Sequence, residues 1–381
     1  MTYLEEYDYL IKGRHVIAGY WIQKQVDNMI RDLQDGRFVY DTTDAHKRIR
    51  FMQTMCLQSK HPYFGKPVEL MPWQLAFYEG LYSFKMADTG LRRYVEALLE
   101  IARKNGKSTM LAADGNTDLF IGTGGSEICC ASNDDKQCKY IWREIAGMRM
   151  RLDPKKAITS QNLVEIRNER KNIIISRMSS RTQNKDGGNY TKTYQDESHD
   201  VDEENGNCEI AEACWRGMST KDDPLFINCT TQGFSRDGCY LDKKIARAKA
   251  VIDGEIDDIH FLPFLYEQDS EQEIWLDESS WEKSNPSLRY GVKKIAKLRR
   301  DVETARTDKE ARLHLLCKDF NIKQNSAQAW LRIEDYTYAQ EIKSLEDFRG
   351  CICLGALDCS QTTDLTNCKI LIMRPEDNTK H

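Results

Sequence analysis

The pattern of hydrophobic and polar residues between positions 93 and 121 predicts a buried strand, a turn and a helix. Residues 93–101, RYVEALLEI, are mostly apolar, as a strand in the middle of a parallel sheet is. A polar and basic turn, ARKNG, follows at 102–106, and a helix-forming stretch begins at Lys107. We therefore expect a core strand, a surface loop and a helix in this order.

The rest of the chain alternates in a similar way between strand-like and helix-like patterns. Residues 225–233, LFINCTTQG, predict a core strand that ends in polar residues, and Pro72 favours the start of a helix. Residues 1 to about 60 and about 266 to 345 have helical patterns, and the charge run at 292–300 is typical of a solvated helix face. We expect an α/β fold in which helices flank both faces of a mainly parallel sheet.

Composition narrows the class of protein. The chain has 381 residues, of which 40% are hydrophobic and 30% charged, so we expect a soluble protein of more than one domain. No apolar stretch approaches the roughly 20 residues that cross a bilayer, and the acidic N-terminus lacks the pattern of a signal peptide. The 13 cysteines include no CxxC pair, which indicates free thiols in the cytoplasm. Because the net charge is −5, DNA contact requires local basic patches.

The turn at 102–109 has the parts of a phosphate-binding loop. Such a loop needs converging backbone N–H groups, a helix N-terminus beneath them and a lysine that reaches in, and a following serine can hold Mg²⁺. The residues that supply these parts are Asn105, Gly106, Lys107, Ser108 and Thr109. The first glycine of the usual GxxxxGK[ST] pattern is replaced by Ile101. On the loop alone, a surface turn that happens to contain Gly-Lys-Ser is an equal alternative.

Three further segments carry side chains that an ATP-hydrolysing site needs. Asp196 and Glu197 follow a β-prone stretch, and such a pair can orient Mg²⁺ and activate the attacking water. Thr230 and Thr231 end a predicted strand at the edge where parallel sheets bind ligands. Gln74 can pair with adenine through its amide. The plainer alternatives are a solvated acidic turn, an ordinary strand end and an exposed helical glutamine.

Together these segments resemble the large terminase subunit of tailed double-stranded DNA bacteriophages, over nearly the whole chain. The resemblance lies in Pro72-Trp73-Gln74, the loop from Arg103 to Ser108, Ala131-Ser132 before a helix, Asp196-Glu197, Thr230 to Gly233, and the segment 281–288, WEKSNPSL. The family tolerates the missing first glycine of the loop. The glycine-containing basic loop at 180–190 also fits the family, and a flexible surface hairpin is its alternative.

The resemblance implies a P-loop ATPase that uses ATP and Mg²⁺ to drive double-stranded DNA into a procapsid. Lys107 would hold the phosphates, Ser108 and Asp196 the metal ion, and Glu197 would activate water. Arg103 would stabilise charge on the γ-phosphate. The remaining implied site residues are Gln74, Asn105, Gly106, Thr109, Thr230 and Thr231, and Arg143 is a candidate arginine finger toward a neighbouring subunit.

The resemblance also implies partners and a place of action. The partners are double-stranded DNA, the small terminase subunit, the portal protein of the procapsid and further copies of this chain in a ring. The place is the cytoplasm of the bacterial host, with no membrane association.

A second enzyme, a ribonuclease-H-like nuclease, follows the motor in this family. Residues 351–358 and 368–373 predict its first hairpin, in which Asp358 would bind Mg²⁺ or Mn²⁺. We expect an N-terminal helical segment at 1–60, an ATPase domain at 61–265, a helical linker or lid at 266–345 and an incomplete nuclease domain at 346–381. Two-metal cleavage needs several carboxylates, and few follow Asp358, so we expect that this chain alone does not cut DNA.

Two other functions are compatible with the same residues. A helicase-like or other DNA-remodelling ATPase shares the loop and the acidic pair, and strand separation would favour it. An inactive prophage remnant would fold and bind nucleotide or DNA without turnover. An ATPase assay with and without duplex DNA separates the three.

Overall fold

The computed structural model of the chain describes residues 1–132, 135–179, 187–198, 208–235, 240–325, 348–358 and 367–373. The chain divides into two compact units, Met1–Ala327 and Gln328–His381. In these described ranges, no helix is both long enough and apolar enough to span a membrane.

A sheet of eight strands forms the centre of the first unit, and it confirms the predicted fold class. The strand order is β11-β3-β9-β8-β4-β7-β6-β5. The strands from β11 to β7 run parallel, and β6 and β5 add antiparallel pairs at one edge. In sheet order the strands are Phe261–Leu265, Glu96–Glu100, Leu225–Thr230, Lys192–Asp196, Glu127–Ala131, Ile173–Met178, Glu165–Asn168 and Thr159–Gln161.

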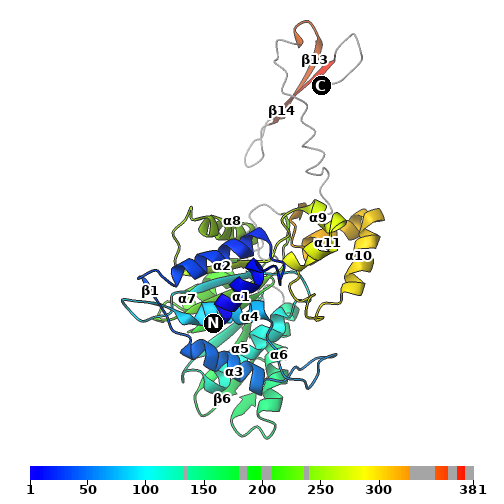
Figure 1. Ribbon diagram of the computed structural model, residues 1–381. Helices are drawn as coiled ribbons and strands as arrows, with labels where there is room; N and C mark the ends of the chain where they lie inside the picture. Colours follow the sequence, from blue (N-terminus) through cyan, green and yellow to red (C-terminus); the bar gives the residue numbers. More distant parts are fainter. Residues whose placement is uncertain are drawn as a thin grey trace. The chain divides into compact units, whose positions relative to one another are not determined.

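Helices cover both faces of this sheet because successive side chains of its strands point to opposite sides (Figure 1). In β3, Leu98 belongs to a hydrophobic cluster with Leu241 and Ile245 of α8 (Tyr240–Asp253). Its neighbour Leu99 belongs to the main core, which includes Leu111 of α5 (Lys107–Ile121). α5 packs against α6 (Asp135–Leu152), and α7 (Cys208–Gly217) contacts β4. The strand predicted at 93–101 is therefore buried on both faces.

The N-terminal region is helical, as predicted, apart from one short strand. Its helices are α1 (Tyr3–Lys12), α2 (Tyr20–Asp32) and α3 (Thr43–Met55), and α4 (Pro72–Ser83) begins at the predicted proline. The strand is β1 (Phe38–Tyr40), which pairs with β2 (Phe84–Met86). The sequence did not predict β1, because three residues are too few to show an alternating hydrophobic pattern. Its partner β2 also lies two helices later in the chain.

A helical group follows the last strand of the large sheet. It consists of α9 (Glu271–Leu276), the 3₁₀ helix η3 (Glu278–Lys283), α10 (Ile295–Thr307) and α11 (Lys309–Asp319). These helices share a small hydrophobic cluster that includes Trp281, Leu298 and Phe320. A two-residue strand, β10 (Phe234–Ser235), pairs in parallel with β12 (Gln324–Asn325) directly after this group.

In the second unit, β13 (Ile352–Asp358) and β14 (Asn367–Met373) form the predicted antiparallel hairpin, with Asp358 opposite Asn367. Most of the predicted loop at 180–190, residues 180–186, lies outside the described residues.

Candidate nucleotide-binding site

The loop at 101–106 leaves the carboxyl end of β3 and enters α5 at Lys107. Lys104 (φ 66°) and Gly106 (φ 91°) adopt left-handed backbone conformations. Alternation of left- and right-handed residues turns successive N–H groups toward one side and creates a concavity for anions. Glycine takes such a conformation without strain, which explains its place directly before the helix. The N-terminus of α5, with its positive dipole end, lies beneath this concavity.

Lys107 is buried against the loop that it follows. Its Nζ donates a hydrogen bond to the carbonyl of Ile101 at 2.9 Å and lies 3.5 Å from the carbonyl oxygen of Ala102. Its side chain therefore folds along the inner side of the loop.

The predicted acidic pair lies at the same edge of the sheet as the loop. Asp196, the last residue of β8, pairs with Cys229 of β9, and Thr230 of β9 pairs with Glu100 of β3. The backbone N–H of Glu197 donates to the carbonyl of Cys229 at 3.0 Å. The carboxyl ends of β3, β9 and β8 thus lie side by side, in the position where open α/β sheets bind ligands.

Electrostatics link the pair to the lysine. Burial and the neighbouring Glu197 carboxylate raise the pKa of Asp196 to about 7, whereas the Lys107 ammonium acts in the opposite direction. Glu197 has a left-handed backbone (φ 55°), which costs a residue with a side chain on the order of 1–3 kcal/mol. Strain of this kind often occurs at functional sites.

Gln74 lies beside the loop, at the first turn of α4. Its Oε1 accepts a hydrogen bond from the N–H of Met71 at 2.9 Å. Its Nε2 lies 3.5 Å from the position that a Cβ on Gly106 would take. The buried amide therefore supports the helix start with one end and faces the loop with the other.

Two predicted nucleotide contacts have other partners through their side chains. Asn105 is fully buried, and its amide oxygen accepts hydrogen bonds from Ser287. The Thr109 hydroxyl donates to Glu144 of α6 at 2.6 Å. Both side chains are therefore engaged with other parts of the protein.

The remaining predicted residues differ in exposure and in position. The hydroxyls of Thr230 and Thr231 are buried and donate to carbonyls of their own segment. Ser108 is half-buried at the start of α5, and Arg103 and Arg143 are exposed. Asp358 ends β13 in the other unit, and its side chain lies outside the described residues.

Sequence reasoning missed Glu144, although it is close to the site. Glu144 is 3% exposed, contacts Lys60 Nζ at 2.6 Å, and its charge contributes to the raised pKa of Asp196. The sequence around Glu144 does not indicate a functional residue, because it does not show that this face of α6 contacts Thr109.

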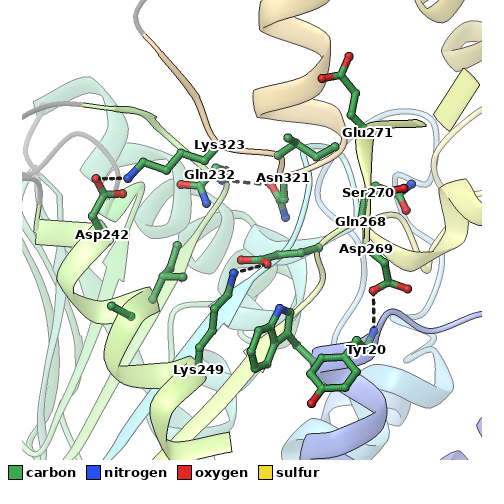
Figure 2. Close-up of a pocket in the computed structure, with 15 residues that line it drawn as sticks. Tyr20, Gln232, Asp242, Lys249, Gln268, Asp269, Ser270, Glu271, Asn321 and Lys323 are labelled. Atoms are coloured by element: carbon green, nitrogen blue, oxygen red, sulfur yellow. Dashed lines mark hydrogen bonds and ion pairs between the residues drawn. The ribbon is translucent and has the colours of Figure 1, made fainter. Parts of the chain in front are cut away.

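A pocket of about 640 Å³ lies between α2, α8 and the residues that follow β11 and α11 (Figure 2). At its walls Lys249 pairs with Glu267 at 2.6 Å and Lys323 with Asp242 at 2.8 Å. It also includes Gln232, which follows Thr231 in the polar strand end. The pocket is therefore adjacent to this segment, while residues 101–109 are not among those that line it.

The residues present fit a nucleotide with Mg²⁺. The left-handed turn supplies an anion concavity, Lys107 a cation, Ser108 a hydroxyl and Asp196 a buried carboxylate. Among the described residues, no group of three or more His, Cys, Asp or Glu side chains is placed to hold a metal ion. Mg²⁺ that is bound together with phosphates needs only one or two oxygens from the protein. Ser108 and Asp196 can supply these oxygens without a larger cluster of ligands.

The sheet order, the loop and the acidic pair define a nucleotide-binding α/β domain of the P-loop type. The sequence matches the family model for the terminase large subunit ATPase domain at residues 72–248 and that for the terminase large subunit endonuclease domain at residues 255–380. The chain belongs to the large terminase family of phages. The endonuclease match begins ahead of α9 and includes the segment that we expected to be a linker.

The solved structures that match this chain include phage large terminases. The large terminase of bacteriophage HK97 is 21% identical with a TM-score of 0.61, and the match covers 88% of this chain and 66% of that one. The large terminase ATPase domain of Thermus phage P74-26 is 14% identical with a TM-score of 0.41 (70% and 100% covered). This chain therefore spans slightly less than two thirds of the length of the HK97 protein. No curated protein matches the chain.

Proposed function

We propose that this chain hydrolyses ATP to move double-stranded DNA into a procapsid, as the motor part of a phage packaging machine. The observation that supports this most strongly is the arrangement of Lys107 and the Asp196-Glu197 pair at one edge of a parallel sheet. Membership in the large terminase family adds the packaging role.

Bound ATP and Mg²⁺ supply the bond that breaks and a Lewis acid beside it. The N–H groups of the loop from Asn105 to Thr109 and the Lys107 ammonium hold the phosphate oxygens. Ser108 and Asp196 would hold the metal ion. Glu197 orients the attacking water and accepts its proton.

Other residues position the substrate and transmit its state. Arg103, exposed in the loop, stabilises charge on the γ-phosphate, and Gln74, beside the loop, is the proposed contact to the adenine. Thr230 and Thr231 transmit the hydrolysis state toward the helices that follow β11. Arg143, exposed on α6, is the candidate arginine finger toward a neighbouring copy in a ring.

The proposed partners follow from the same function. They are double-stranded DNA, the small terminase subunit, the portal protein and further copies of this chain, in the cytoplasm of a bacterial host.

The test measures nucleotide binding and turnover, with and without duplex DNA. We expect Lys107→Ala to lose nucleotide binding and Glu197→Ala to keep binding but lose at least about 100-fold in turnover. Lys171→Ala, an exposed lysine that donates to the Gly122 carbonyl, is the matched control and should change neither. Full turnover by Lys107→Ala would remove the loop from the mechanism. Strand separation by the wild-type chain would favour a helicase-like ATPase instead.

The nuclease expectation is tested separately. We expect no metal-dependent cleavage of plasmid DNA by this chain. Cleavage that disappears in Asp358→Ala would show that the hairpin β13-β14 belongs to a working nuclease site.

A further inference from the structure

The turn at 284–287 joins the phosphate loop to the end of α11. Asn285 is fully buried at the centre of this turn. Its Oδ1 accepts hydrogen bonds from Asn105 Nδ2 at 3.1 Å and from Lys293 Nζ at 2.6 Å. Its Nδ2 donates to the carbonyl of Asp319 at 2.7 Å. One side chain therefore contacts the loop, a buried lysine and the last residue of α11.

Ser287 completes the contact with the loop. Its N–H and Oγ donate to Asn105 Oδ1 at 3.2 and 2.6 Å. Asn105 Nδ2 also donates to the carbonyl of Ala102 at 2.9 Å. The Asn105 side chain thus connects Ala102, the first residue of the 102–106 turn, with Ser287 in the 284–287 turn. These hydrogen bonds hold the loop in place.

The end of α11 touches two parts of the candidate site. The carbonyl of Lys318 accepts a hydrogen bond from the N–H of Arg103 at 3.0 Å. Lys318 Nζ donates to the carbonyl of Gln232 at 2.8 Å. A movement of this helix end would therefore reach the phosphate loop and the polar strand end together.

The charge within this network is balanced. Lys293 is 7% exposed, and its Nζ lies 2.8 Å from Asp319 Oδ1. Burial lowers the pKa of Lys293, and the Asp319 carboxylate opposes that effect. The Lys293 ammonium also donates to Asn285 Oδ1, so this largely buried ion pair is held by a further hydrogen bond.

We propose that Asn285 is a positioning residue for nucleotide binding: through Asn105 it holds the phosphate loop in its binding conformation and ties that loop to α11. Asn285 itself need not touch the nucleotide. The proposal rests on the proposed function, because it assigns the loop to a nucleotide. The proposal also assigns a role to the segment Asn285-Pro286-Ser287, which has none in the proposed hydrolysis of ATP.

The expected effect is on binding more than on chemistry. Loss of the Asn285 amide leaves Asn105 with fewer partners, so the loop samples other conformations and its N–H groups must be reordered on binding. Such a cost applies to the ground state and the transition state alike, which raises KM and leaves kcat nearly unchanged. We expect Asn285→Ala to raise KM for ATP about 10-fold and to change kcat less than about threefold.

The test has a readout that needs no nucleotide. In the nucleotide-free full chain, amide hydrogen exchange at 103–108 should be faster in Asn285→Ala than in the wild type. The matched control is Asn168→Ala. Asn168 is 2% exposed on β6, and it is hydrogen-bonded to Leu119, Arg170 and Lys171 far from the loop in sequence. It should reduce stability without changing exchange at 103–108 or KM.

Ser287→Ala keeps the proposal testable if Asn285→Ala does not fold. It removes one hydrogen bond to Asn105, and we expect faster loop exchange and a KM increase of about twofold to threefold. Unchanged loop exchange and unchanged KM in a folded variant would overturn the proposal, as would an equal effect of Asn168→Ala. If the wild-type chain binds no ATP or ADP, the proposed function fails, and exchange at 103–108 alone decides whether Asn285 holds the loop.

Discussion

At the scale of single residues, a pair of carboxyl groups lies where β3 meets the phosphate loop. Glu100 is fully buried, and burial together with the Glu267 carboxylate raises its pKa well above the usual range. Lys249 and Lys107 act in the opposite direction but do not outweigh these effects. Glu100 therefore binds its proton more tightly in the folded chain than in the unfolded chain.

This pair predicts a pH dependence of stability. A carboxyl group whose pKa is raised by folding stabilises the protein fully below its unfolded pKa, near 4.5, and loses that contribution as pH rises through the folded value. Glu100→Gln keeps the shape and removes the titration. We expect the variant to have a higher melting temperature than the wild type at pH 8, with the gap closing toward pH 5. A gap that is constant across this range would mean that Glu100 does not titrate as stated.

The sequence located the loop and the acidic pair but not the contacts of individual side chains. Asn105 and Thr109 were both expected at the nucleotide because they lie in the loop. Asn105 instead bonds Ser287, 182 residues away, and Thr109 bonds Glu144, 35 residues away. Residue types in a motif indicate its backbone geometry, whereas a side-chain partner depends on which distant segment packs beside it.

At the scale of elements, a buried group of charges joins α3, α5 and β8. Lys192 of β8 contacts Asp114 and Asp118 of α5, and its Nζ donates to the hydroxyl of Tyr82 at 2.8 Å. Arg48 of α3 pairs with Asp118 at 2.7 Å. Although burial alone would raise it, Arg48 and Lys192 together lower the pKa of Asp118 to about 2.

This group explains why β8 was hard to predict as a central strand. The sequence at 191–193, TKT, looked too polar for the middle of a sheet, yet β8 is buried throughout. Lys192 is accommodated because two aspartates, 78 and 74 residues earlier, compensate its charge. By contrast, the strand at β9 and the helix starts at Pro72 and Lys107 were predicted well, because local apolar runs, proline and glycine determine them.

Removal of the lysine should destabilise the link between these elements. Lys192→Met leaves Asp114 and Asp118 buried with Arg48 as the remaining cation among the contacts described, and loss of one partner of a buried ion pair costs about 3–5 kcal/mol. We expect a loss of that size in the free energy of unfolding, measured by urea denaturation. Lys171→Met should cost less than about 0.5 kcal/mol, because its side chain lies at the surface. Equal effects of the two substitutions would contradict a special role for the buried group.

At the scale of the whole molecule, the candidate site and its support lie in one unit. The phosphate loop, the acidic pair and the helices α9–α11 all precede Ala327, and so does every hydrophobic cluster found among the described residues. The second unit contributes the hairpin β13-β14 in its described part. A unit with its own core can fold by itself, whereas an isolated two-stranded hairpin is marginal in water.

Nucleotide binding should therefore be a property of the first unit alone. A fragment of residues 1–327 contains the described contacts that hold the loop, including those of Asn285 and Lys318. We expect it to melt within about 2 °C of the full chain and to bind ADP with the same affinity within about twofold, because every hydrophobic cluster of the described residues lies within it. Calorimetry and titration with a fluorescent nucleotide measure both quantities. A clearly lower melting temperature or a weaker affinity would show that residues after 327 stabilise the first unit, and the effect of Asn285→Ala would then have to be measured in the full chain only.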